Sequence, residues 1–173
     1  NIYIFTPEIV PNWTGHFVLL ILNSFLPAFL AEKIFLILYL LGLPYAFRYF
    51  VKQINPKNIL LSYLSFPFCY TFLFLLGFYN FSIGLLFCFL SLAFWMKLKK
   101  NPGQLKWTIF LLTSVFLTYF SHVFVFLFLG ILTLLDFIFH ALLSRKENTG
   151  QISTSKGKTF LRLSISFLVP SVL

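Results

Sequence analysis

Polar side chains that could take part in chemistry lie at a few short breaks between long apolar runs. His16 ends a proline-containing stretch, Tyr79 and Asn80 follow Gly77 between two apolar runs, and His122 separates two more. An imidazole can accept or donate a proton near neutral pH, and a carboxamide both donates and accepts hydrogen bonds. These groups suit proton transfer and hydrogen bonding to a bound substrate.

Each of these residues also has a purely structural interpretation. Asn80 could cap the helix that follows it, because asparagine is favoured at that position. His122 and His16 suit contact with water and headgroups at a membrane surface. Asp136 and His140 are four residues apart, so they form either a local pair that lowers the cost of burial or a proton relay. The sequence contains no Gly-rich phosphate loop, paired-cysteine metal site or serine-nucleophile motif. The cofactor, if the protein uses one, is unknown from the sequence.

The composition excludes a water-soluble domain. Of the 173 residues, 60% are hydrophobic and only 17 carry a formal charge, which is too few to cover a soluble surface. The net charge of +9 is explained by basic loops that face anionic lipid headgroups, so membrane lipid and not nucleic acid is the expected partner.

The apolar runs predict an all-α fold, a polytopic transmembrane helix bundle of about five to seven helices in a single domain over residues 1–173. A loop at the membrane surface (1–16) precedes an interfacial or re-entrant helix (17–30). Five spans follow between residues 34 and 143, at 34–51, 59–76, 81–96, 107–119 and 123–143. Gly42 and Pro44 predict a kink in the first span. A polar loop (144–159) leads to a truncated span (160–173), and this ending, with Asn1 at the start, predicts a fragment of a longer protein.

Counting charges along these spans predicts the orientation. Twelve of the thirteen Lys and Arg residues fall on one face, and the other face receives only Lys33. The basic face is therefore expected to be cytoplasmic. The outer face then holds Glu8, His16, Lys33, the Tyr79-Asn80 turn and His122.

Three stretches resemble multi-spanning bacterial membrane proteins of the GT-C glycosyltransferase type: LPAFLAEKIFLILYLLGLP (26–44), GFYNFSIGL (77–85) and YFSH (119–122). The resemblance implies an inner-membrane protein with an outer-face active site, a polyprenyl-phosphate-linked sugar as donor, and inverting transfer to a hydroxyl or lipid. It also implies an acidic residue in the first outer loop, which Glu8 could match, and a basic residue at the departing phosphate, for which Lys33 and His122 are the candidates.

These observations lead to one expected function and two alternatives. In a glycosyltransferase, His16 or Glu8 would act as base, His122 or Lys33 would stabilise the leaving phosphate, and Asn80 and Tyr79 would contact substrate. A transporter or flippase would instead use Gly42, Pro44 and the short 107–119 helix as broken-helix elements. A non-catalytic membrane assembly protein is the third possibility.

Overall fold

The computed structural model describes residues 11–146, and every regular element in this part of the chain is a helix. The elements are α1 (Thr14–Asn23), α2 (Ala28–Ile54), η1 (Pro56–Ser65), η2 (Pro67–Tyr70), α3 (Phe72–Leu75), α4 (Tyr79–Lys100), α5 (Leu105–Ser121) and α6 (Val123–Lys146). The segments η1 and η2 are 3-10 helices. The all-α prediction is confirmed.

Within residues 11–146, four helical segments are long and apolar enough to cross a membrane. They are Ala28–Ile54, Pro56–Leu75, Tyr79–Lys100 and Val123–His140. The predicted fourth span falls on α5, whose 17 residues extend only about 25 Å, less than the roughly 30 Å hydrocarbon core. Four candidate spans are consistent with an integral membrane protein, and the predicted number of five to seven is not confirmed within residues 11–146.

The predicted interfacial helix is divided in two by the structure. Helix α1 ends at Asn23, and α2 begins at Ala28 after Pro27, whose ψ of 144° is not helical. Residues 28–30 therefore belong to the first long helix and not to the short one. Helix α2 then continues as a single element past Pro44.

The predicted span 59–76 is not a continuous α-helix. It consists of η1, η2 and α3, because Pro67 lacks an amide hydrogen and the hydroxyls of Ser62 and Ser65 bond to carbonyl oxygens three residues back, at 2.6 and 2.7 Å. The Thr71 hydroxyl then accepts a hydrogen bond from the amide of Phe74 and starts a new helical turn. The turn before α4 is completed by Gly77, whose φ of +84° favours glycine.

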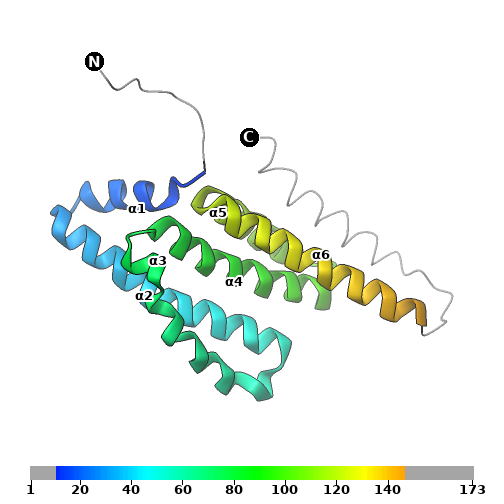
Figure 1. The fold of residues 1–173 in the computed structure, drawn as a ribbon. Helices are drawn as coiled ribbons and strands as arrows, with labels where there is room; N and C mark the ends of the chain where they lie inside the picture. Colours follow the sequence, from blue (N-terminus) through cyan, green and yellow to red (C-terminus); the bar gives the residue numbers. More distant parts are fainter. Residues whose placement is uncertain (1–10, 147–173) are drawn as a thin grey trace.

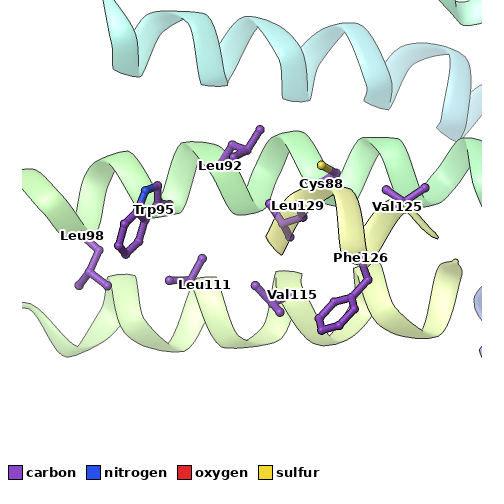
Figure 2. Packing of buried hydrophobic residues seen from close by; sticks show 9 residues of the cluster. All are labelled: Cys88, Leu92, Trp95, Leu98, Leu111, Val115, Val125, Phe126 and Leu129. Atoms are coloured by element: carbon purple, nitrogen blue, oxygen red, sulfur yellow. The ribbon is translucent and has the colours of Figure 1, made fainter. Parts of the chain in front are cut away.

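Helix α4 is the central element, because α2 packs on one side of it and α5 on another (Figure 1). Its inward-facing side chains meet those of α5 and α6 in one apolar cluster (Figure 2). The cluster contains Cys88, Leu92, Trp95, Leu98, Leu111, Val115, Val125, Phe126 and Leu129. This packing holds the α5–α6 junction against the first turns of α4.

The two ends of the bundle differ in charge. Near one end, the Lys100 ammonium donates to the carbonyl oxygen of Gln53, which brings the last turns of α4 and α2 together. Lys97, Lys99 and Lys100 are all in the last turn of α4, whereas the opposite end of α2 carries Lys33 in its first turns. The charge asymmetry expected from the sequence is thus present in the folded chain.

Candidate functional site

A pocket of about 280 Å³ lies at the end of the bundle opposite the basic turns. Its lining includes Gly15 and His16 from α1, Phe35 from α2, Tyr79 and Asn80 from α4, and His122 from the α5–α6 junction. In Figure 1, α1 lies across this end, where α4 begins and α5 passes into α6. Three separate chain segments that the sequence assigned to one membrane face therefore form a single concave site.

Three helix N-termini meet at this pocket. Helix α1 begins at Thr14, α4 at Tyr79 and α6 at Val123, and each starts within two residues of a lining residue. Helix N-termini carry partial positive charge and amides without helical partners. No carboxylate from residues 11–146 lines the pocket. The site is therefore suited to an anionic group such as a phosphate.

Asn80 connects two of these N-termini. Its side-chain oxygen accepts a hydrogen bond from the amide of Gly15 at 2.6 Å, and its side-chain nitrogen donates to the carbonyl of Asn12 at 2.6 Å. Asn80 lies inside the first turn of α4, where Phe78 holds the cap position. The interpretation that Asn80 caps its own helix is wrong, because its carboxamide instead serves the first turn of α1.

Glycine at position 15 makes this contact possible. A Cβ atom at Gly15 would lie 2.6 Å from the Asn80 side-chain oxygen, much closer than a carbon atom is tolerated. Gly84 has a similar role on α4, since its Cβ would lie 3.3 Å from the Cβ of Ser121. Gly15 therefore lets the Asn80 side chain reach the backbone of α1, and Gly84 lets side chains of the α5–α6 junction pack against α4.

The segment before α1 is also attached to the end of α5. The amides of Asn12 and Trp13 both donate to the carbonyl oxygen of Phe120, each at 2.9 Å. The last carbonyls of a helix lack partners within the helix, so this carbonyl is available to them. Asn12 has a φ of +82°, a conformation that asparagine adopts more readily than most residues.

His122 occupies the junction between α5 and α6. Its backbone is extended, with φ −164° and ψ 121°, and its ring packs edge-to-face against Phe81 with centroids 5.2 Å apart. Nδ1 is buried and has no hydrogen-bond partner among the described residues. Burial lowers the pKa of His122 below its ordinary value, which favours the neutral imidazole. A neutral imidazole can still donate one hydrogen bond to a ligand.

The other predicted site residues have different positions. His16 lines the pocket with an exposed side chain, and Tyr79 lines it while packing edge-to-face on Phe35, at 5.9 Å between ring centroids. Lys33 is absent from the lining, and its ammonium lies 3.9 Å from the centroid of the Phe29 ring. Glu8 lies outside the described residues.

The sequence interpretation missed the lining residues Asn12, Gly15 and Phe35. Phe35 lies near the start of an apolar run, where its residue type does not distinguish it from its neighbours. The glycine could have been noticed as a small residue next to His16. Its close contact with Asn80, however, connects positions 65 residues apart.

A second polar cluster lies outside the pocket, between α4 and α6. The Asp136 carboxylate accepts hydrogen bonds from the Lys99 ammonium at 2.7 and 3.0 Å and from the Trp95 indole at 2.9 Å. His140 Nε2 is 3.6 Å from the same carboxylate. The local pair with His140 is therefore the longer contact, and the closer partners of Asp136 come from another helix.

Among residues 11–146, no group of three His, Cys, Asp or Glu side chains could hold a metal ion.

Comparison with known protein families, with characterised proteins and with solved structures finds no match for this chain. The likeness to GT-C glycosyltransferases therefore rests on the sequence motifs alone.

Proposed function

We propose that this protein is a membrane glycosyltransferase whose pocket binds the phosphate of a polyprenyl-phosphate-linked sugar and transfers the sugar to an acceptor hydroxyl. The observation that carries the proposal is the meeting of three helix N-termini and two histidines in one pocket that no described carboxylate lines. Partial positive charge and free donors favour a phosphate there over a neutral or cationic ligand.

The reaction needs two groups with opposite roles. The bond between the anomeric carbon and the phosphate oxygen breaks, while the acceptor oxygen bonds to that carbon and loses its proton. We assign proton removal to His16, whose side chain is exposed at the pocket, and hydrogen-bond donation to the departing phosphate to His122. Tyr79, which lines the pocket, would contact the sugar or the lipid. Asn80 would act indirectly by holding α1 in place.

The proposed orientation places the pocket at the outer face and the basic helix ends in the cytoplasm, as in a bacterial inner membrane. The distribution of Lys and Arg between the two ends supports this orientation. A polyprenyl phosphate reaches such a site through the lipid phase, since its chain stays in the hydrocarbon while its headgroup enters the pocket.

The test compares two histidine-to-alanine variants of the full-length protein in proteoliposomes that contain a labelled polyprenyl-phosphate sugar. His122→Ala should reduce sugar transfer by at least about tenfold, equivalent to about 1.4 kcal/mol of transition-state stabilisation. His140→Ala is the matched control, because His140 lies toward the opposite end of the bundle, and it should transfer sugar at the wild-type rate. Normal transfer by a stably folded His122→Ala protein would contradict the proposal.

A lipid flippase is the second candidate function. The observation that favours it is that the segment Pro56–Leu75 is interrupted. Within this segment, the carbonyl oxygen of Cys69 accepts a hydrogen bond from the Tyr39 hydroxyl at 3.1 Å. Interrupted helices at membrane depth recur in transporters. Movement of a labelled polyprenyl phosphate between leaflets without sugar transfer would support this function and replace the first.

A further inference from the structure

The basic end of the bundle contains a group of positive charges that the pocket does not use. Among residues 11–146, the carboxylate near this end belongs to Asp136, and Lys99 already pairs with it at 2.7 Å. Lys97, in the last turn of α4, and Lys106, in the first turn of α5, form no ion pair with a described residue. This leaves two ammonium groups at the α4–α5 turn without a described counter-ion.

Both ammonium groups contact the same indole ring. The Lys97 nitrogen is 5.2 Å and the Lys106 nitrogen 5.1 Å from the ring centroid of Trp107. The two charges therefore lie at most about 10 Å apart, close to the Debye length of about 10 Å at 0.1 M salt, and they repel each other. Attraction to the ring face holds each of them beside the indole despite this repulsion.

The start of α5 adds further donors without acceptors. Gln104 occupies the cap position but makes no side-chain capping bond, so the first amides of α5 lack a side-chain partner. Lys106 is in the first turn, where the helix dipole disfavours a cation. The Trp107 indole nitrogen and the Thr108 hydroxyl are buried and have no hydrogen-bond partner among the described residues. The Lys97 and Lys106 ammonium groups and the first amides of α5 are therefore the donors at this turn that an anion could contact.

We infer that Lys97, Lys106 and Trp107 form a binding site for the phosphate headgroup of an anionic glycerophospholipid in the leaflet at this end. A lipid fits better than a soluble anion because the site continues into an apolar surface. Trp107 stacks with Phe94 at 6.3 Å between centroids, Phe94 stacks with Phe110 at 5.4 Å, and the Phe110 side chain is exposed. This aromatic row would lie along an acyl chain, and indole rings are favoured at the headgroup level.

The test measures lipid binding to the full-length protein in a neutral detergent by native mass spectrometry, with phosphatidylglycerol and phosphatidylcholine of equal chain length. Lys97→Gln/Lys106→Gln should raise the apparent dissociation constant for phosphatidylglycerol by roughly tenfold or more. It should change phosphatidylcholine binding little. Arg48→Gln/Lys57→Gln removes the same net charge from exposed positions on α2 and η1, so it is the matched control and should retain binding.

Three results would overturn the inference. Equal loss of phosphatidylglycerol binding in both double variants would indicate diffuse attraction and no defined site. Displacement of the lipid by excess inorganic phosphate would identify a soluble anion as the ligand. Unchanged binding in the Lys97/Lys106 variant would remove both lysines from lipid recognition. If that variant has a lowered melting temperature, Lys106→Gln alone carries the same test, because Lys106 is exposed.

Discussion

Replacing Asn80 by alanine should release the first turn of α1 from the bundle. The substitution removes the hydrogen bonds to Gly15 and Asn12, both 2.6 Å long, and leaves the buried Gly15 amide without its acceptor. A neutral hydrogen bond contributes about 0.5–1.5 kcal/mol net, so the two together should weaken docking of α1 by about 1–3 kcal/mol. Amide exchange in residues 12–23 should then accelerate roughly 5- to 150-fold.

Hydrogen–deuterium exchange of the full-length protein in detergent measures this effect directly. Asn101→Ala is the control, since the Asn101 side chain donates a single 3.3 Å bond to Lys97 at the other end of α4. It should leave exchange in residues 12–23 unchanged. In Asn80→Asp, the exchange rate of residues 12–23 should lie between those of wild type and Asn80→Ala. A carboxylate keeps the acceptor for the Gly15 amide but loses the donor to the Asn12 carbonyl.

The aspartate variant also separates the two possible roles of Asn80. Aspartate and asparagine cap helices about equally well, so a residue that only capped α4 would tolerate Asn80→Asp. Unchanged exchange in residues 12–23 of Asn80→Ala would refute the proposed link between α1 and α4. Acceleration confined to the first turn of α4 would restore the local capping role.

Two further predictions concern the ion pair and the pH dependence. Lys99→Met leaves a carboxylate that is only 21% exposed without its ammonium partner, and it should lower the unfolding free energy by about 2–3 kcal/mol in thermal or denaturant unfolding. Lys99→Leu/Asp136→Leu should recover most of this loss, and a double variant less stable than Lys99→Met would contradict that account. Because burial lowers the pKa of His122, the unfolded chain binds the proton first as the pH falls. The stability linked to His122 is therefore complete above about pH 6.5 and decreases below it, and His122→Asn should reduce this acid sensitivity in melting curves.

The sequence alone determined the helical class and the separation of the two ends. A chain this apolar can satisfy its backbone in lipid only with helices or a closed barrel, and the long apolar runs indicated helices. Since successive helices alternate direction, His16, the Tyr79-Asn80 turn and His122 could all be assigned to one end before any contact was known. The pocket shows these three segments together.

Only the tertiary structure decided which groups meet. Local spacing correctly identified the i, i+4 pair of Asp136 and His140, but the closer partner, Lys99, is 37 residues away on another helix. The alternative in which Asn80 caps its own helix also relied on local spacing, although its partners lie 65 and 68 residues earlier in the chain. A side chain bonds to whatever donor or acceptor lies within about 3 Å, and for distant segments that neighbour is set by how the helices pack.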